Sequence, residues 1–346
     1  MSSLRVNNPG LLTTIQDDGR IGYEKYGMPT AGAMDILSLQ LGNILVGNDR
    51  YEAAAEITFI GPEIEFYENL IIAITGADIS PTINGKEIEM YSTVYINKGD
   101  ILRFGTLKKG CRAYLAVSGG FDLPQIMNSK STYLRGKLGG VEGRKLKKGD
   151  ILQVNINKGY KYLGVRRIPK NFIPYYGSQY TVRVIMGPED YRFTGKGIET
   201  FLNSEYTLSN QCDRMGYRLN GPKIEHRNGA DIISGGITLG AIQVPGHGEP
   251  IIMMADRQTT GGYTKIANVI SVDIPYLAQL KAGDRVRFQQ INIEEAQTLL
   301  KEREEKLLKL VYDFEKTTKK VIVKNSINLK IRSNGKKFNV GIQEIE

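Results

Sequence analysis

The sequence is poor in the two residue types that build disulfide frameworks and most structural metal sites. Its 346 residues include only two cysteines, Cys111 and Cys212, and two histidines, His226 and His247. Two cysteines are too few for a disulfide framework or a zinc site, and neither histidine has a partner at metal-ligand spacing. We therefore expect a reduced protein with no metal ligands among its residues.

Long hydrophobic runs are missing as well. No stretch approaches the roughly twenty apolar residues that a membrane-spanning helix needs, and the opening residues MSSLRVNNPG lack the basic start and apolar core of a signal peptide. Hydrophobic residues make up 41% of the chain and charged residues 24%, which is typical of a globular protein. We expect a cytoplasmic protein without membrane contacts, long enough for two domains.

Positive charge is concentrated at one end of the chain. The formal net charge is +9, but eight Lys or Arg and only two acidic residues lie between Lys316 and the C-terminus. Such a tail is more often a solvated surface than a binding arm, and no basic stripe interleaved with aromatic residues occurs elsewhere. The charge pattern therefore argues against binding to nucleic acid.

Common catalytic signatures are also absent. The stretch GGVEGRK at residues 139–145 has glycines and a lysine, but it lacks the spacing of a phosphate-binding P-loop. Ser118 precedes two glycines, yet it has no G-x-S-x-G context and no evident triad partner. The sequence thus gives no support to a self-contained P-loop ATPase, serine hydrolase or metalloenzyme.

Most of the chain has the pattern of short β-strands. Asn84-Gly85 predicts a hairpin, and Gly-Asp turns at residues 99–100, 149–150 and 283–284 each precede an alternating apolar strand. GPEIEF at Gly61 and GPKIEH at Gly221 each lead into a strand-rich stretch. This echo indicates two related β units, the second beginning near residue 180.

Two stretches have helical periodicity. Residues 33–48 end on Gly47, a typical helix terminator. Residues 294–315 place apolar residues on one stripe, and this helix is expected to pack on the β units or on a partner. The short polar strands after it predict an appended hairpin or a partly ordered tail. We therefore predict three regions: residues 1–178, residues 179–290, and residues 291–346.

Polar residues gather at four places in the chain. In the first, Gln16, Asp17 and Arg20 surround a glycine turn, and Asp35 opens the first predicted helix. Such residues bind ligands in many sites. An Asp–Arg pair across the turn and an Asp at the helix cap are the purely structural alternative, which is the more common arrangement.

The second cluster is glycine-rich. Residues 127–150 contain Arg144 and several glycines. A loop of this composition receives a phosphate or carboxylate through backbone N–H groups and a guanidinium. The same composition also describes a flexible surface loop, and the sequence leaves both possibilities open.

The third and fourth clusters lie in the second half of the chain. Asp213, Arg214 and Arg218 precede a predicted strand, and residues 256–265 interrupt two apolar strands with a dense polar patch. Gly261-Gly262 is expected to turn consecutive N–H groups toward one point, as in an oxyanion site. The structural alternative is a hairpin with an Asp–Arg bridge. Unpaired charges beside buried strands are unfavourable, which favours a site.

Six stretches, taken in order, resemble one known family. They are PGLLTTIQDDGRIGYEKYGMPTAGAMD, LVGND, AAAEITFIGPEIEF, AVSGGFDLP, DRMGYRLNGP and PIIMMADRQTTGGYTKIANVISVDI. They are similar to the biotin-dependent carboxyltransferase family, which includes allophanate hydrolase subunit 2, the Kip antagonist protein and the C subunit of 5-oxoprolinase. The resemblance covers residues 4–290. It implies a mainly β fold of tandem cyclophilin-like β-barrels with a few short helices, followed by a C-terminal helix and tail.

The resemblance implies a subunit of an ATP-dependent 5-oxoprolinase, which opens 5-oxoproline to glutamate. ATP and Mg²⁺ would act at the level of the complex. One expected partner is of the Kip-inhibitor type, equivalent to the B subunit of 5-oxoprolinase, and the third component is of the A-subunit type. Whether the isolated chain is active stays open.

Two alternatives remain within this resemblance. The chain could be a carboxyltransferase subunit of a urea carboxylase, with biotin as cofactor, or a regulator without catalytic activity that antagonises a histidine-kinase inhibitor. No Met-Lys-Met biotin acceptor follows the C-terminal helix. The family pattern implies no role for His247.

The site residues follow from the 5-oxoprolinase interpretation. We expect Asp256 and Gln258 to orient the substrate, and the amides of Gly261 and Gly262 to stabilise an oxyanion. The residues expected to bind the substrate or its negative charge are Gln16, Asp17, Arg20, Asp35, Arg144, Arg214, Arg218, Thr259, Thr260 and Tyr263.

Overall fold

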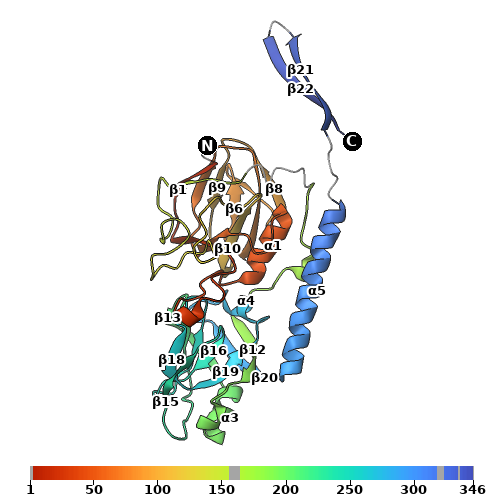
Figure 1. Cartoon of the computed structure of the whole chain (residues 1–346). Coiled ribbons are helices and arrows are strands. Elements are labelled where there is room, and N and C mark those ends of the chain that lie inside the picture. The colour runs from red at the N-terminus through yellow and green to blue at the C-terminus, as the bar shows by residue number, and fades with distance from the viewer. Residues whose placement is uncertain (1–2, 156–163, 318–322, 334–335, 346) are drawn as a thin grey trace.

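The structure is a computed structural model that describes residues 3–155, 164–317, 323–333 and 336–345, with side chains described up to residue 316. Two β-rich units lie one above the other, and a long helix runs along one side (Figure 1). The predicted fold class is confirmed, because the protein is mainly β, with a closed barrel, few helices and a C-terminal helix. No helix in the described part is both long and apolar enough to cross a bilayer.

The first unit contains two sheets that share one hydrophobic core. In sheet order, the six-stranded sheet consists of β11 (Ile151–Leu152), β1 (Leu4–Asn8), β4 (Glu63–Phe66), β9 (Ile101–Phe104), β6 (Pro81–Ile83) and β7 (Lys86–Glu87). The five-stranded sheet consists of β2 (Leu12–Gln16), β3 (Ala54–Thr58), β10 (Lys109–Val117), β5 (Leu70–Asp78) and β8 (Thr93–Ile96).

The five-stranded sheet is covered on both faces. Ile57 and Leu115 point toward the six-stranded sheet, whereas Ala54 and Tyr114 point toward helix α1 (Ile36–Val46). This alternation follows from the two-residue period of a strand. Burial on both faces explains why every residue of β3 is buried.

Helix α1 begins and ends as its sequence predicts. The side chain of Asp35 accepts a hydrogen bond from the Ser38 N–H at 2.9 Å, which caps the N-terminus. Gly47 ends the helix with φ of 73°, a left-handed conformation that glycine adopts without strain. The helix is buried nearly all round, because it lies between the five-stranded sheet and α5 (Ile293–Thr317).

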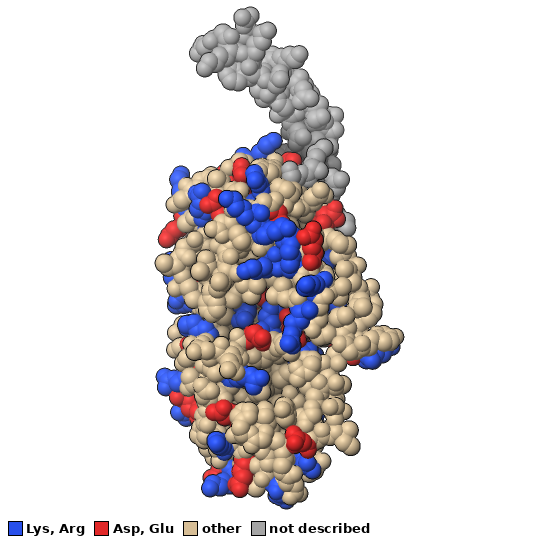
Figure 2. All heavy atoms as spheres, turned by 90° about the vertical axis from the view of Figure 1, so that its left-hand side faces the viewer, with Lys and Arg blue, Asp and Glu red and all other residues tan. Residues whose placement is uncertain are grey.

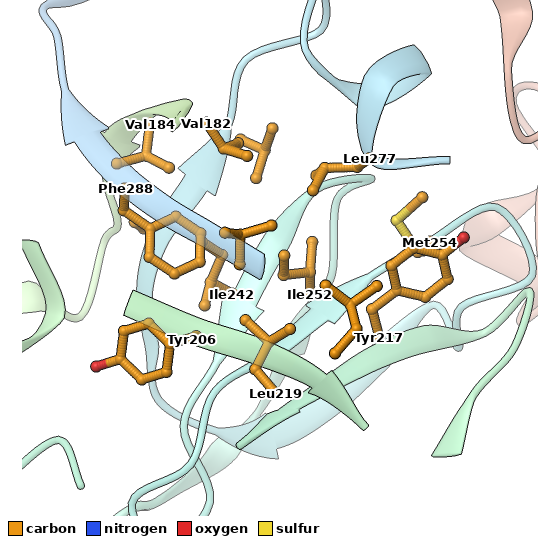
Figure 3. Close-up of a cluster of buried hydrophobic side chains, with 14 of the residues drawn as sticks. Val182, Val184, Tyr206, Tyr217, Leu219, Ile242, Ile252, Met254, Leu277 and Phe288 are labelled. Atoms are coloured by element: carbon orange, nitrogen blue, oxygen red, sulfur yellow. The ribbon is translucent and has the colours of Figure 1, made fainter. Parts of the chain in front are cut away.

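The second unit is a closed barrel. In barrel order, its strands are β12 (Gln179–Met186), β19 (Lys265–Val269), β16 (Ala241–Gln243), β17 (Ile251–Met253), β14 (Gly216–Asn220), β13 (Glu205–Cys212) and β20 (Arg285–Gln290). The parallel pairing of β12 with β20 closes it. Figure 3 shows its interior, where aliphatic and aromatic side chains such as Val184, Ile252 and Phe288 fill the centre.

Smaller elements surround the two units. The two-stranded ribbon of β15 (Asp231–Gly236) and β18 (Thr260–Tyr263) lies outside the barrel. Within the described residues, the short helices besides α1 are η1 (Glu24–Tyr26), η2 (Lys170–Phe172), η3 (Asp190–Arg192), α3 (Gly195–Asn203) and α4 (Ile274–Leu277).

Helix α5 braces both units. Its Leu307 and Leu310 pack into the core cluster around α1, while Arg303 donates a hydrogen bond to the Ser271 carbonyl of the second unit at 3.2 Å. The expectation that this helix packs on the β units is therefore confirmed. Beyond it, β21 (Val323–Ser333) and β22 (Lys336–Ile345) form an antiparallel pair. The boundaries at residues 178 and 290 stay a prediction.

Candidate functional site

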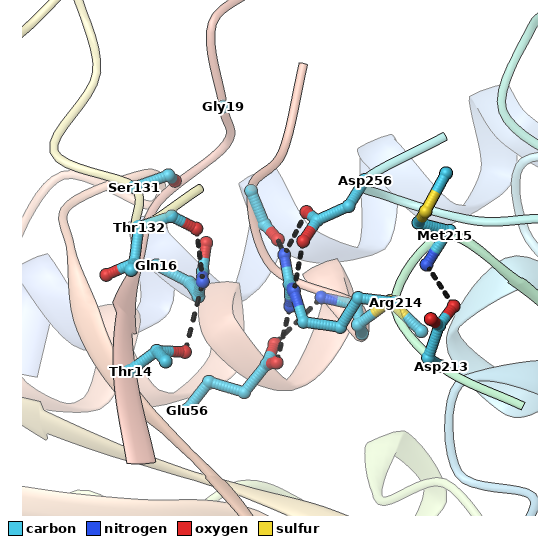
Figure 4. Close-up of polar contacts among 12 residues, drawn as sticks. Thr14, Gln16, Gly19, Glu56, Ser131, Thr132, Asp213, Arg214, Met215 and Asp256 are labelled. Atoms are coloured by element: carbon cyan, nitrogen blue, oxygen red, sulfur yellow. Dashed lines mark hydrogen bonds and ion pairs between the residues drawn. The ribbon is translucent and has the colours of Figure 1, made fainter. Parts of the chain in front are cut away.

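A buried ion cluster joins the two units. Arg214 of the second unit donates to Glu56 on β3 at 2.6 Å and to both carboxylate oxygens of Asp256 at 2.9 and 3.1 Å. All three side chains are buried. In Figure 4 the two carboxylates approach the guanidinium from opposite sides. The structure therefore brings together two predicted residues, Arg214 and Asp256, but it places them in contact with each other.

The surroundings of the cluster favour the ionised form of Glu56, the carboxylate from the first unit. Burial alone raises the pKa of Glu56, but Arg214 and then Arg112 outweigh this effect, so the pKa is lowered. For Asp256 burial is the larger influence, and its pKa is raised in spite of the Arg214 ion pair. Two carboxylates thus compete for one guanidinium, and Glu56 is the better neutralised of the two.

A polar row crosses the five-stranded sheet beside this cluster. Thr14, Glu56 and Tyr114 are direct cross-strand neighbours, so their side chains share one face. The Tyr114 hydroxyl donates to Glu56 at 2.6 Å and accepts from the Asp35 N–H at 2.8 Å. The row connects the ion cluster to the start of helix α1.

Asp35 is fully occupied by protein groups. Its carboxylate accepts hydrogen bonds from Ser38, from the Tyr176 hydroxyl at 3.0 Å and from the Gln279 amide of the second unit at 2.7 Å. This is the capping alternative with an additional link between the units. A direct contact between Asp35 and a ligand would require breaking one of these bonds.

Asp17 organises the glycine-rich loop of the first unit. Its carboxylate accepts hydrogen bonds from the Gly19 N–H at 2.9 Å, the Ser129 hydroxyl at 2.7 Å, the Lys130 N–H at 2.5 Å and the Ser131 hydroxyl. The first and second predicted clusters are therefore neighbours in space. The structural alternative suggested an ion pair between Asp17 and Arg20. Asp17 instead binds the loop.

Arg20 lies under the same loop with an incomplete set of partners. The residue is 0% exposed, and its Nη2 donates to the Ser131 carbonyl. Among the described residues, its Nε and Nη1 find no hydrogen-bond acceptor. The pKa of Arg20 is lowered, because the effect of burial is larger than the opposing Coulomb attraction to Asp17 and then Asp256. The guanidinium therefore keeps unused donors near the junction of the units.

Gln16 lacks a hydrogen-bond donor to its side-chain carbonyl, whereas Arg20 lacks acceptors. Its amide nitrogen donates to Thr14 at 3.0 Å and to the Thr132 carbonyl at 3.1 Å, and the side chain is 0% exposed. Its carbonyl oxygen Oε1 has no donor in the part of the chain that the structure describes. Buried polar groups normally have partners, so each such gap needs a reason.

The loop over these residues is strained. Four non-glycine residues in it have positive φ: Met127, Asn128, Lys137 and Glu142, with values of 50 to 60°. Such conformations each cost about 1–3 kcal/mol and cluster at functional sites. Gly139, with φ of 71°, packs so closely that an added Cβ would lie 2.1 Å from Nη2 of Arg20.

A groove with a volume of about 440 Å³ opens on the barrel side of the junction. Among its lining residues are three predicted ones, Arg218, Gln258 and Tyr263, together with Asp213 and Met215. Arg135, from the glycine-rich loop, reaches across and contacts Met215. The groove therefore borders the loop that covers Arg20. In Figure 2 Lys and Arg gather on the upper unit and reach into the hollow between the units.

The predicted Gly261-Gly262 turn is wrong. Both glycines lie within strand β18, where Gly261 pairs with Gly235 of β15. Consecutive N–H groups of a strand point in opposite directions, so they do not converge on one oxyanion. Gly261 is needed for packing, since a Cβ there would lie 2.5 Å from Ile237. Thr260 is the first residue of this strand, and Thr259 precedes it at a bend.

Arg144 lies apart from the other predicted residues. It forms ion pairs with Asp150 at 2.7 Å and with Glu142 at 2.8 Å on the first unit. Its pKa is raised, chiefly by the hydrogen bond to Asp150. These pairs hold the end of the glycine-rich loop.

Sequence reasoning missed several residues of this region. Glu56 is the one charged residue in the apolar stretch AAAEITF, a signal for a buried charge with a partner. Ser131 carries no distinctive signal. Asp18 has its pKa raised to about 6, first by burial and then by Asp17.

Comparison with known proteins places this arrangement in a family context. The family model described as carboxyltransferase domain, subdomain A and B, matches residues 26–290. The 5-oxoprolinase C subunit of Haemophilus influenzae is 39% identical over 292 residues, which are 84% of this chain and 92% of that protein. The protein of the same name from Escherichia coli is 37% identical over 295 residues, 85% of this chain and 93% of its own length.

A solved structure is also similar. The urea amidolyase of K. lactis superimposes with a TM-score of 0.83 at 32% sequence identity. The match covers 90% of this chain but only 20% of that protein. The chain thus spans about a fifth of the K. lactis enzyme.

Proposed function

The chain belongs to the carboxyltransferase domain family, subdomains A and B, and from this premise we propose that it is a component of an ATP-dependent 5-oxoprolinase complex. One observation carries the proposal. Two relatives that bear the name of the 5-oxoprolinase C subunit match at 39% and 37% identity over 92% and 93% of their own length. The complex would be cytoplasmic and would open 5-oxoproline to glutamate.

The proposed reaction opens an amide. Water adds to the lactam carbonyl carbon, the C–N bond breaks, and the nitrogen leaves as the amine of glutamate. ATP, with Mg²⁺ at the level of the complex, would first phosphorylate the lactam oxygen and leave as ADP, and the phosphoryl group would depart as inorganic phosphate after water has added and the C–N bond has broken. Among the described residues, no group of three His, Cys, Asp or Glu side chains is placed to hold a metal ion. The proposal places nucleotide and metal at the level of the complex, whose other members are of the A and B types of 5-oxoprolinase.

The contribution of this chain lies at the junction of its units. Unused donors on Arg20 and an unused acceptor on Gln16 are suited to hold a small polar substrate. Gln258 and Tyr263 line the adjoining groove, where an amide and a hydroxyl offer hydrogen bonds to a carbonyl. Basic residues around the hollow favour the approach of an anion.

Reconstitution tests the proposal directly. The purified chain is combined with its two candidate partners, ATP, Mg²⁺ and 5-oxoproline, and glutamate and ADP are followed. We expect glutamate only when all three proteins are present. Gln258→Ala should lower turnover about tenfold without loss of stability. Asp256→Ala is a poor test of catalysis, because it breaks the buried Arg214 ion pair.

A second candidate is a carboxyltransferase subunit that acts on urea or another amide, with biotin as the carrier. The likeness to the K. lactis urea amidolyase favours it. If the reconstituted complex assembles but forms no glutamate, carboxybiotin and urea are tested next. Tight binding to a partner without turnover in any mixture would instead support a regulator that antagonises a histidine-kinase inhibitor.

A further inference from the structure

Two buried side chains at the junction have hydrogen-bonding groups of opposite kind left over. Arg20 keeps the N–H groups of Nε and Nη1, and Gln16 keeps its Oε1 carbonyl, without a partner among the described residues. Both side chains are 0% exposed. A buried polar group without a hydrogen bond is unfavourable by about 1–3 kcal/mol, and more when the group is charged.

The two side chains are neighbours in space. Arg20 donates to the carbonyl of Ser131, and Gln16 donates to the carbonyl of Thr132 at 3.1 Å. Consecutive residues are about 3.8 Å apart along the chain, so both side chains meet one short piece of the glycine-rich loop. The unused cationic donors and the unused carbonyl therefore lie on two side chains that are held by adjacent residues of the loop.

The geometry points to a subsite that binds a compact molecule in which a carboxylate lies next to an amide N–H, with Arg20 on the carboxylate and Gln16 on the amide. 5-Oxoproline has this chemistry, because a single carbon joins its carboxylate to its lactam nitrogen. Urea has two amide nitrogens but no carboxylate. The inference rests on the proposed function and names the group by which that substrate is recognised.

Residues 127–150 form the cover over the subsite, and their backbone is strained. The cover contains Gly136, Gly139, Gly140 and Gly143, together with non-glycine residues of positive φ before and among them. The backbone strain disfavours the closed loop, whereas the hydrogen bonds from the loop to Asp17 hold it in place. Ligand entry requires this segment to lift, since neither Arg20 nor Gln16 is accessible to solvent when it is down.

The first test pairs a protein variant with a substrate variant. The reconstituted complex is assayed with 5-oxoproline and with its neutral carboxamide, which keeps the lactam but lacks the negative charge. We expect kcat/KM to be about 10- to 100-fold lower for the carboxamide in the unmodified complex. Arg20→Gln should lower kcat/KM for 5-oxoproline by a similar factor, mainly through KM, and change the carboxamide less than about threefold.

Two further variants control this result. Arg20→Lys keeps the charge and should recover part of the preference for the acid. Arg103→Gln, at an exposed ion pair on the first unit, should leave both substrates unchanged. If Arg20→Gln affects acid and carboxamide equally, or neither of them, Arg20 is only a structural residue and the subsite is wrong.

The amide contact is tested in the same manner. N-methyl-5-oxoproline lacks the lactam N–H, so the unmodified complex should discriminate against it, and Gln16→Met should remove most of this discrimination. Equal discrimination in both proteins would overturn the assignment of Gln16.

Calorimetry separates failure of the subsite from failure of the proposed function. Binding of 5-oxoproline and its carboxamide to the assembled complex is measured without ATP. A complex that forms no glutamate but binds the acid in an Arg20-dependent manner retains the subsite and loses the proposed reaction. A complex that turns over 5-oxoproline with no dependence on Arg20 retains the reaction and loses the subsite.

Discussion

Arg214 and Arg20 both lie buried at the junction of the two units, yet their surroundings differ. Arg214 has two carboxylate partners, Glu56 and Asp256, and a carbonyl partner at Gly32. Arg20 has one carbonyl partner and two nitrogens without any among the described residues. The Arg214 guanidinium bonds to groups of both units and so links them. The Arg20 guanidinium has one partner and retains N–H donors that can bind another group.

The loops around the two arginines differ in the same way. The Arg214 cluster is fixed by strand β3 and by residues at the ends of β14 and β17. The Arg20 region lies under a loop that contains four non-glycine residues with positive φ. Charges with a full set of partners indicate a structural role, whereas groups without partners under a strained loop indicate a binding role.

The largest expected effect comes from removing the satisfied arginine. Arg214→Met leaves Glu56 and Asp256 buried with no cation between them, so we expect a loss of about 3–5 kcal/mol in the free energy of unfolding. Denaturant unfolding of the purified chain measures it. A loss below about 1 kcal/mol would mean that the two arginines do not differ as described.

A glycine in the cover gives the next largest effect. Gly139→Ala places a Cβ 2.0 Å from the Ser131 carbonyl and 2.1 Å from Arg20, at φ of 71°. Gly149→Ala is the matched control, since its φ is 92° and nothing lies within 4 Å of the added carbon. We expect the control to lose about 1–2 kcal/mol from backbone strain alone, and Gly139→Ala to lose clearly more and to reduce turnover. Equal losses would show that the cover does not press on Arg20.

Asp18 provides a pH-dependent effect of intermediate size. Its pKa is raised to about 6, first by burial and then by Asp17, so its protonated form is the one that the fold prefers. The stability from this preference is complete below the unfolded value of 3.8 and is lost as the pH rises through about 6. Asp18→Asn should raise stability at pH 7 by about 1 kcal/mol and flatten the change between pH 4 and 6. Unfolding of both proteins across this range decides the point.

The smallest expected effect is at Arg20 itself. Arg20→Met removes one hydrogen bond to Ser131 but also a buried charge with unused donors, and we expect these contributions to cancel within about 1 kcal/mol. Thermal unfolding next to Arg214→Met gives the comparison on one scale. A loss for Arg20→Met as large as that for Arg214→Met would remove the reason to separate the two arginines.

Much of the fold follows from local pattern. The α1 helix is predictable from its apolar spacing, its Asp35 cap and the Gly47 terminator, because each acts over a few residues. The β-rich character follows from alternating strands and Gly-Asp turns for the same reason. The C-terminal helix α5 is evident from one apolar stripe, of which Leu307 is buried whereas Leu300 is exposed.

The candidate site was predictable in part. Sequence reasoning identified Asp17, Arg20, Asp256 and Arg214 as polar residues that needed an explanation. It did not identify which of them are partners. The pairing of Asp17 with Arg20 and the Asp–Arg bridge within the hairpin, both suggested by proximity in sequence, are replaced by Asp17 with the loop and Asp256 with Arg214. The prediction of a turn at Gly261-Gly262 was wrong, because pairing with β15 holds these two residues in an extended strand.

By itself, the sequence determined the elements and the chemistry available to them: a mainly β chain, two helices, a glycine-rich loop and four clusters of polar residues. Tertiary structure alone decided which charges are neutralised. Arg214 meets Glu56, 158 residues away in the chain, and Arg20 meets Ser131, 111 residues away. A hydrogen bond depends on a few ångströms of separation, and only the packing of the two units against each other sets that separation.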